Sequence, residues 1–352
     1  MSTADTAPVR DEERVDLEAL SLYLHGRVPG ADGALELEQF PHGHSNLTYL
    51  LRCGGEEYVL RRPPLGPLPP RAHDMIREGR LLERVAPFYP PAPRPLLLCE
   101  DSNVIGAPFY LMERRRGVVA RNAAPAEHAS REDFPRRASE AFIDALAELH
   151  SVDIERHQLG SLGKPDGFLA RQVQGWSGRW MKAKIEASPA METVSSRLLE
   201  RLPKSQPATL VHNDFKLDNT MFDASDPGRV VAVFDWEMSS VGDPLVDLGV
   251  MLCYWPEAND PPARRDSICP LTSQPGWPRR AELLDRYHRK TGRDLAGIAY
   301  YETFGLFKLA VVLQQIYYRF HMGQTSDKRF RCFDERVRSL AESALARSED
   351  IV

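Results

Sequence analysis

The spacing of apolar residues has a strand-like period of two in the first third of the chain and a helical period in most of the remainder. Residues 1–10 carry no pattern and are expected to be disordered, whereas residues 11–28 show helical spacing. The pair Gly54-Gly55 between two apolar runs predicts a tight hairpin turn. Strands are expected over 34–40, 46–53, 56–62, 94–98 and 108–113, with a helix over 71–85.

Further along the chain, the pattern changes to long amphipathic helices. Between them, short apolar runs over 209–211, 220–222 and 229–234 predict strands. Helices are expected over 138–150, 169–186, 190–202, 243–254, 280–290, 298–321 and 330–347. A chain of 352 residues usually exceeds one compact core. The order therefore predicts an α+β protein, with a small β-rich N-terminal lobe over 1–113 and a larger, mostly helical lobe over 114–352.

The composition is that of an ordinary water-soluble protein, with 42% hydrophobic and 27% charged residues. The net charge of -5 lacks the basic excess of nucleic-acid binders, so no nucleic-acid partner is expected. Scattered cysteines without a CxxC pair favour a reducing, cytoplasmic location over a disulfide framework or a zinc site. The polar, acidic N-terminus is not a signal peptide, and no apolar run is long enough to predict a membrane span.

The segment 212–219, His-Asn-Asp-Phe-Lys-Leu-Asp-Asn, has the spacing H-x-D-x-K-x-x-N of a phosphotransfer catalytic loop. Phosphoryl transfer needs a carboxylate that takes the proton of the acceptor hydroxyl, and cations near the transferred group. We expect Asp214 to be this base and Lys216 to place positive charge beside the phosphoryl group. Asn219 would hold a magnesium ion, and His212 would brace the loop rather than react.

Asp235 ends the apolar run 230–234 and so stands at the tip of a buried strand, one short hairpin after Asn219. A carboxylate at a strand end and a nearby amide suit Mg²⁺, which keeps several waters and uses phosphate oxygens. The alternative is an ordinary β-turn aspartate beside a hairpin. The strand context and the spaced residues of the loop favour the metal site.

Two features of the N-terminal lobe indicate a nucleotide site. The turn 43–46 between two strands could lay backbone N–H groups and the Ser45 hydroxyl over phosphates, with Asn46 beside it, although most such turns are only hairpins. Arg61 ends a strand and Glu78 lies on the next helix. Kinases use such an opposite-charge pair to hold the cation that clamps the nucleotide phosphates.

The neighbouring arginines Arg61 and Arg62 should point to opposite faces of their strand, because side chains alternate along a strand. We expect Arg61 to point inward, and the alternative is a surface arginine on an edge strand. The strand 109–113 runs into Arg-Arg-Arg-Gly. Backbone groups just past this strand either pair with adenine or belong to an ordinary linker between lobes.

Asp243 precedes Pro244 and opens an apolar helix. An aspartate is a good residue to cap a helix start, and proline suits the first helical turn. Asp243 and Asp247 are therefore interpreted as structural support in preference to direct catalysis.

Two tryptophans, Trp176 and Trp180, are four residues apart in a segment that also carries Arg171 and Arg179. At this spacing they share one face of a helix. They are either part of the core or line a substrate groove in which an arginine meets an anionic group.

Taken together, these motifs resemble the aminoglycoside phosphotransferase and choline kinase family, within the protein-kinase-like fold. The resemblance covers about 20–345 of the chain. It rests on VHNDFKLDN, VVAVFDWEMSSVGDPLVDLG, ALAELHSVD and EEYVLRRPP…AHDMIREGRLLERV. The LRRPP stretch and the helix GFLARQVQGWSGRW are similar to one branch of the family, the kinase-like domain fused to some acyl-CoA dehydrogenases.

This resemblance implies a bilobal fold with ATP in the cleft and Mg²⁺ as a further cofactor. The roles that it implies fall on Asp214 as base, Asn219 and Asp235 as magnesium ligands, Glu78 as partner of the phosphate-binding cation, and Met112, Glu113 and Arg114 as the hinge. One departure is Arg61, because many relatives have lysine on this strand. Arginine keeps the charge but has a different shape.

The expected function is ATP-dependent phosphoryl transfer to a hydroxyl group of a small molecule, by a monomer or homodimer. The alternative, motivated by Arg61, is a nucleotide-binding pseudokinase with a regulatory or scaffolding role. A protein kinase is less favoured, because after Asp235 the chain enters GDPLVD without a long activation segment. Residues 245–345 lack the dense acidic lining that cationic aminoglycosides require. This favours a neutral or anionic hydroxylated acceptor, such as a hydroxyacyl thioester or a sugar-like alcohol.

Overall fold

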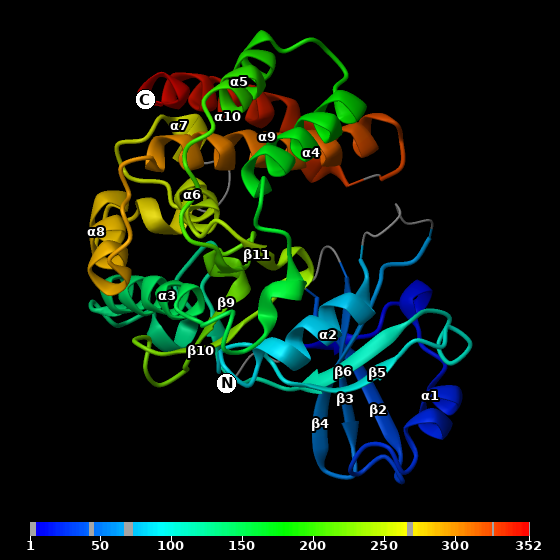
Figure 1. Cartoon of the computed structure of the whole chain (residues 1–352). Coiled ribbons are helices and arrows are strands. Elements are labelled where there is room, and N and C mark those ends of the chain that lie inside the picture. Colours follow the sequence, from blue (N-terminus) through cyan, green and yellow to red (C-terminus); the bar gives the residue numbers. More distant parts are fainter. Residues whose placement is uncertain (1–4, 42–45, 67–72, 266–269, 326, 352) are drawn as a thin grey trace. The chain divides into compact units, whose positions relative to one another are not determined.

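The computed structural model describes residues 5–41, 46–66, 73–265, 270–325 and 327–351. The chain forms two compact units, of which the first comprises Met1–Arg116 with Val231–Glu237 and the second Gly117–Val230 with Met238–Val352. The first unit contains an antiparallel sheet and the second is mainly helical, which confirms the predicted fold class (Figure 1). The domain boundary expected after residue 113 stays a prediction.

The first unit is built on a six-stranded antiparallel sheet in the order β1-β2-β3-β4-β6-β5. Its strands are β1 (Ala7–Pro8), β2 (Leu35–Gln39), β3 (Leu47–Cys53), β4 (Glu56–Arg62), β5 (Pro95–Cys99) and β6 (Phe109–Glu113). Gly54 and Gly55 join β3 to β4 with φ angles of 56° and 84°, which confirms the predicted hairpin. β1 corrects the expectation of disorder over 1–10, because Ala7 pairs with Gln39 of β2.

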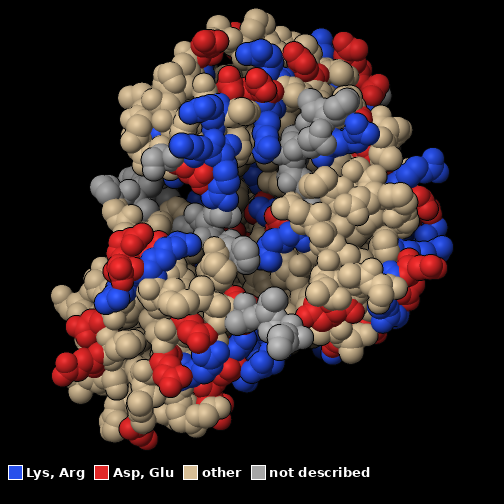
Figure 2. Space-filling model, turned by 180° about the vertical axis from the view of Figure 1, so that it is seen from behind, with Lys and Arg blue, Asp and Glu red and all other residues tan. Residues whose placement is uncertain are grey.

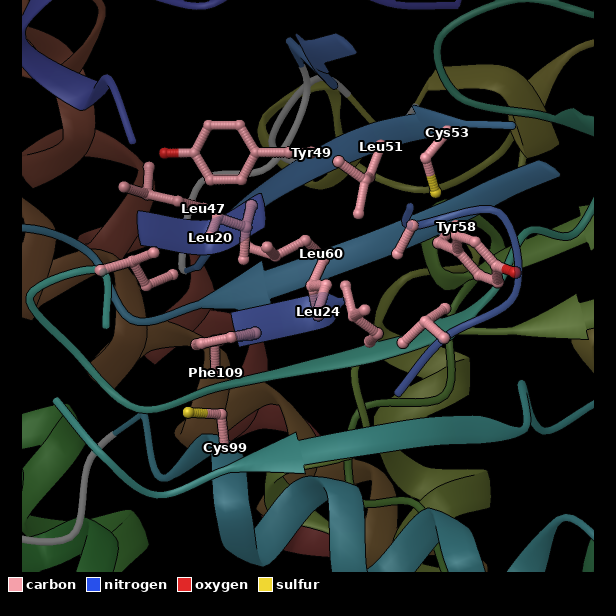
Figure 3. Close-up of a cluster of buried hydrophobic side chains, with 14 residues drawn as sticks. Leu20, Leu24, Leu47, Tyr49, Leu51, Cys53, Tyr58, Leu60, Cys99 and Phe109 are labelled. Carbon is pink, nitrogen blue, oxygen red and sulfur yellow. The ribbon is translucent and has the colours of Figure 1, made fainter. Parts of the chain in front are cut away.

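Two helices cover the sheet from its two faces. After a short 3₁₀ turn, η1 (Asp11–Glu13), α1 (Leu17–Leu24) starts at Asp16 and α2 (Met75–Val85) starts at Asp74. Each of these carboxylates accepts a backbone N–H of its first turn at 2.9 Å. Figure 3 shows the core between α1 and the sheet, which includes Leu20, Leu24, Leu47, Tyr49, Leu51, Tyr58, Leu60 and Phe109.

The second unit is an assembly of helices around α9. Its helices are α3 (Phe134–His150), α4 (Phe168–Ala183), α5 (Pro189–Glu200), α6 (Leu245–Cys253), α7 (Pro262–Arg265), α8 (Arg280–Thr291), α9 (Ile298–His321) and α10 (Phe333–Arg347). α9 packs against α4, α5, α6 and α10. In Figure 1, α4 and α5 (green) lie beside the orange α9 and the red α10.

α6 and α9 approach each other very closely at two glycines. A Cβ atom on Gly249 would lie 2.1 Å from the carbonyl oxygen of Tyr301, and one on Gly305 would lie 2.6 Å from the carbonyl oxygen of Gly249. Real Cβ atoms do not come this close to backbone, so both positions require glycine. The contact fixes the part of α9 that carries Lys308, one turn after Gly305.

Short strands of the second unit frame the loop 212–219. β8 (Thr209–Val211) pairs antiparallel with β11 (Ser240–Gly242), and β7 (Val118–Val119) pairs with β9 (Thr220–Phe222). β10 (Val230–Val233) carries the chain into the first unit. Single 3₁₀ turns are η2 (Ala126–His128), η3 (Leu159–Leu162), η4 (Leu217–Asn219), η5 (Trp236–Met238), η6 (Pro270–Ser273), η7 (Lys328–Cys332) and η8 (Ser348–Asp350).

The surface and the helices add two findings. No helix within the described ranges has both the length and the apolar character to cross a membrane. On the face that Figure 2 shows, Lys and Arg side chains lie among Asp and Glu side chains.

Candidate active site

The loop after β8 is held in an unusual backbone conformation by a buried carboxylate. Asn213 has a φ of 64°, which is rare for a residue other than glycine and often marks functional loops. Asp247 of α6 accepts hydrogen bonds from the backbone N–H groups of His212 at 2.6 Å and Asn213 at 2.5 Å. Asp247 is fully buried, so these bonds are shielded from water.

Asp247 is itself bound from behind by a buried histidine. Nε2 of His150, the last residue of α3, lies 3.1 Å from Oδ2 of Asp247, and Nδ1 of His150 lies 2.6 Å from the hydroxyl oxygen of Tyr287. Burial lowers the pKa of His150, although Asp247 pulls it the other way. The motif ALAELH thus supplies structural support to the loop.

Asp243 opens α6 in the way the sequence indicates. Its Oδ1 accepts from the backbone N–H of Leu245 at 3.0 Å, and its Oδ2 accepts from the hydroxyl of Tyr301 at 2.7 Å and from the N–H of Gln206 at 3.1 Å. These bonds agree with a structural role for this carboxylate.

Asp214 stands on this loop with its carboxylate partly accessible, at 16% side-chain exposure. Its Oδ2 accepts from Nζ of Lys216 at 2.8 Å and from Nδ2 of Asn219 at 3.1 Å. Burial alone would raise the pKa of Asp214, but the positive charges of Lys216 and Lys308 lower it below its ordinary value. The carboxylate is therefore ionised and can accept a proton or a hydrogen bond.

The other expected loop residues also lie beside Asp214. His212 is buried, and its Nδ1 accepts the backbone N–H of Asp214 at 3.3 Å, as expected of a bracing residue. Asn219 also donates its Nδ2 to the carbonyl of Asp214 at 2.9 Å. Since the amide nitrogen of Asn219 is used in this way, its oxygen is the atom left for a metal ion.

Lys308 is a residue of this region that the sequence analysis did not assign to the site. Its ammonium group donates to the carbonyl of Asn213, and only 6% of the residue is exposed. Burial lowers the pKa of Lys308, although Asp214 and Asp247 oppose the change. The signal in the sequence is a single lysine inside the apolar run 304–312, where a buried cation needs a partner.

In the first unit, Arg61 and Glu78 come together as the sequence predicts. Nε of Arg61 lies 3.2 Å from Oε2 of Glu78, and Nη2 donates to Oδ1 of Asp235 at 2.6 Å. Burial would lower the pKa of Arg61, but the two carboxylates raise it. Nε of Arg61 and Oε2 of Glu78 have no aligned hydrogen-bond partner among the described residues, so their contact is an ion pair without a well-directed hydrogen bond.

Burial shifts the pKa of Glu78 upward, in the direction opposite to its effect on Arg61. It raises the pKa of Glu78 to about 7, and Asp235 and Glu237 add to the shift, although Arg61 opposes it. Glu78 also accepts the backbone N–H of Trp236 at 3.1 Å.

Asp235 groups with the first unit by its contacts, although it follows the boundary expected after residue 113. The physical reason is that the end of β10 binds the first unit, since the N–H of Val233 donates to the carbonyl of Pro91 at 2.8 Å. Asp235 has a φ of 68°, a second rare conformation at a candidate functional residue.

The remaining nucleotide-site candidates differ in what the structure shows. Ser45 lies outside the described residues. Asn46 is buried, and its amide bonds Oε2 of Glu237 at 3.2 Å and Nδ1 of His73 at 2.8 Å. Its side chain is thus bound within the first unit, and its expected phosphate contact stays a prediction.

The hinge candidates have their side chains bound to protein groups. Met112 is buried in β6, and Oε1 of Glu113 accepts the N–H of Arg94 at 2.9 Å. Arg114 donates to Glu57 at 2.7 Å and to Asp5 at 3.0 Å. A contact with a nucleotide base therefore falls to the main chain of this segment and stays a prediction.

The chain belongs to the phosphotransferase enzyme family, whose sequence profile matches residues 36–283. Mouse acyl-CoA dehydrogenase family member 10 is 36% identical over 348 residues, which are 98% of this chain and 32% of that protein. Mouse acyl-CoA dehydrogenase family member 11 is 35% identical over 99% of this chain and 45% of its own length. The chain thus spans less than half the length of these curated relatives.

Solved structures show the same fold. A candidate aminoglycoside phosphotransferase from Ralstonia eutropha is 31% identical, with a TM-score of 0.79 over 96% of this chain and 99% of that chain. Choline kinase from Cryptosporidium parvum has a TM-score of 0.64 at 10% identity, and the match covers 95% of this chain and 96% of that chain. Aminoglycoside phosphotransferase APH(4)-Ia, in complex with AMP-PNP and hygromycin B, has a TM-score of 0.55 at 16% identity. This match covers 95% of this chain and 97% of that chain. The resemblance and the protein-kinase-like fold are confirmed.

Proposed function

We propose that the chain is an ATP-dependent phosphotransferase that moves the γ-phosphoryl group of ATP to a hydroxyl of a small molecule. One observation carries the proposal within the family. The ionised carboxylate of Asp214 is held by Lys216 and Asn219 on a loop that Asp247 braces. This is the arrangement of a carboxylate that orients an acceptor hydroxyl beside a cation.

The residues present suit ATP and magnesium. Arg61 supplies a buried cation whose Nε has no aligned partner, and Asp235 and Asn219 supply oxygen atoms of the kind that Mg²⁺ binds. The family relative APH(4)-Ia was solved with AMP-PNP, which supports a nucleotide for this chain. When bound, magnesium neutralises phosphate charge. We assign its protein ligands to Asn219 and Asp235.

The residues of the chain then act as follows. Asp214 accepts the proton of the acceptor hydroxyl as the oxygen forms its bond to phosphorus and the bond to the leaving ADP breaks. Its lowered pKa makes it a weak base, so its main contribution is to orient the hydroxyl. Lys216 places positive charge beside the transferred group, while His212 and Asp247 keep the loop in place.

One observation favours the alternative of a nucleotide-binding pseudokinase. Nη2 of Arg61 lies 2.6 Å from Asp235, so the candidate metal ligand is already paired with a cation that is bulkier than the usual lysine. A protein of this kind would bind nucleotide without transferring the phosphoryl group.

A transfer screen separates the two proposals. The protein is incubated with ATP, Mg²⁺ and a panel of aminoglycosides, choline-like amines, sugars, macrolides and hydroxyacyl-CoA compounds, and phosphorylated products are sought by mass spectrometry. The kinase proposal expects a product that Asp235→Ala abolishes while the fold is retained. ATP-induced thermal stabilisation with no product from any acceptor would instead support the pseudokinase, and full activity of Asp235→Ala would refute the metal assignment.

A further inference from the structure

Two cations share one aromatic ring in the second unit. Trp176 of α4 is buried, with 4% of its surface exposed. The guanidinium carbon of Arg179 lies 4.2 Å from the centre of its ring, and the ammonium nitrogen of Lys308 on α9 lies 5.3 Å from a ring centre of the same indole. An indole attracts cations without neutralising their charge. The ring therefore has two positive groups in contact with it.

This pair of cations adjoins the candidate base. Lys308 donates to the carbonyl of Asn213, which directly precedes Asp214 in the chain. The positive charges of Lys216 and Arg179 act on Lys308, and so does the negative charge of Asp214. All these residues belong to the second unit.

No carboxylate of the described residues forms a direct ion pair with either cation, although the negative charge of Asp214 acts on Lys308. Within the described part of the chain, Arg179 makes no hydrogen bond or ion pair, and Lys308 makes no ion pair. Asp247 spends its carboxylate on backbone N–H groups and on His150. Arg179 is exposed as a residue, although partial burial of its guanidinium group lowers its pKa.

We propose that Arg179 and Lys308 bind an anionic group, a carboxylate or a phosphate, that the acceptor alcohol carries. The proposal rests on the proposed function and narrows its acceptor class. A guanidinium group that contacts an aromatic ring through its central carbon can still donate from its N–H edge in a bidentate bond to such an anion. Polycationic acceptors such as aminoglycosides would be repelled by the same pair.

Arg179 gives a cleaner test of the anion site than Lys308, because Lys308 also has a structural role. The bond from Lys308 to Asn213 supports the loop, so a loss of activity in a Lys308 variant would have two explanations. Within the described part of the chain, Arg179 interacts with the ring of Trp176, and it is an exposed residue of α4. A glutamine at this position removes the charge and should leave the fold intact.

The experiment compares Arg179→Gln with Arg171→Gln, the same change on the same helix. Arg171 donates to the carbonyls of Lys164 and Asp166 and is the matched control. The acceptors are the positional isomers of hydroxypentanoate, their methyl esters and their coenzyme A thioesters. For each, kcat and KM are measured, together with the KM for ATP.

The expected result is a rise of about 10- to 100-fold in the KM for the anionic acceptors in Arg179→Gln, the size of a lost charge-assisted bond. The KM for the methyl esters and the KM for ATP should change little in Arg179→Gln. In the Arg171→Gln control, the KM for every acceptor should change little. If Arg179→Gln raises the KM only for the free acids, the anion is a carboxylate. If it raises the KM only for the thioesters, the anion is a phosphate. Equal effects on acids and esters, or a change only in the KM for ATP, would overturn the inference.

A binding measurement keeps the test independent of turnover. Calorimetry titrates the same free acids and thioesters into Asp214→Asn, with and without the Arg179→Gln change. Binding that Arg179→Gln weakens supports the anion site even if no acceptor of the panel is phosphorylated, which would count against the proposed function alone. Binding that Arg179→Gln does not weaken, or no binding of either compound class, contradicts the anion site.

Discussion

The two units hold their cations in different ways. In the first unit, Arg61 is flanked by two carboxylates, Glu78 and Asp235. In the second, Lys308 is bound by the carbonyl of Asn213, and Arg179 lies on an indole ring. A cation with two carboxylates is compensated in charge, whereas cations held by a carbonyl dipole and a π face remain positive towards a ligand. The difference lies in direct pairing: the first cluster pairs its cation with carboxylates, whereas the cations of the second have no carboxylate partner among the described residues.

Breaking the compensated cluster should have the largest effect on stability. Arg61→Met leaves Glu78 and Asp235 close together without their cation, and we expect a loss of about 3–5 kcal/mol in the free energy of unfolding. The measurement is urea unfolding followed by circular dichroism. Arg62→Met is the matched control, because Arg62 is equally buried and no described carboxylate pairs with it. An equal loss in both variants would show that burial, and not the pair, decides.

The close crossing of α6 and α9 should be the next most sensitive feature. Gly305→Ala places a Cβ 2.6 Å from backbone, so we expect a loss of about 1–3 kcal/mol in the free energy of unfolding and a displaced Lys308. Gly175→Ala in α4 has open space around its new Cβ and should be neutral or slightly stabilising. Unchanged stability of Gly305→Ala would contradict the crossing.

Removing Lys308, which forms no ion pair with the described residues, should cost less than removing Arg61, which forms two. Lys308→Met leaves the carbonyl of Asn213 without its donor, for which we expect about 1–2 kcal/mol in the free energy of unfolding. Lys308→Met removes no ion pair, whereas Arg61→Met leaves two carboxylates without their cation. The same urea unfolding measures it, and a loss as large as that of Arg61→Met would contradict the proposed difference between the two clusters.

The two units should also respond to pH with opposite signs. The pKa of Glu78 is raised from 4.5 to about 7, so its contribution to stability is present below its ordinary pKa and is lost as pH rises through about 7. The pKa of His150 is lowered from 6.5, so its contribution is present above that value and is lost as pH falls. Each effect should be smaller than the substitutions above.

Unfolding of the wild type, Glu78→Gln and His150→Asn from about pH 5 to about pH 8 tests these signs. The difference between wild type and Glu78→Gln should fall with rising pH, and that between wild type and His150→Asn should rise. If each of these differences in the free energy of unfolding is the same at every pH, neither group titrates in this range.

Local pattern predicted the parts of the fold and site that depend on neighbours in the sequence. The glycine pair at 54–55 gave the hairpin, and strand alternation together with the charges of Arg61 and Glu78 gave their contact. The spacing within 212–219 placed Lys216 and Asn219 beside Asp214.

The features that sequence reasoning missed depend on contacts between distant segments. Lys308 reaches the loop because Gly249 and Gly305 bring α9 onto α6, and no periodicity encodes that crossing. The bonds from the loop backbone to Asp247 are also long-range. The grouping of Asp235 with the first unit likewise depends on partners far away in the sequence, such as Arg61.

The central claim is that Asp214 serves transfer of a phosphoryl group to an alcohol. The most direct test mixes the protein with ATP, Mg²⁺ and an acceptor that the screen identifies, and follows the phosphorylated acceptor by mass spectrometry in the wild type and in Asp214→Asn, with ATP binding measured by calorimetry in both. The account predicts product in the wild type and a loss of roughly 100-fold or more in its rate of formation in Asp214→Asn, with ATP binding retained. A variant that forms product at the wild-type rate would contradict it.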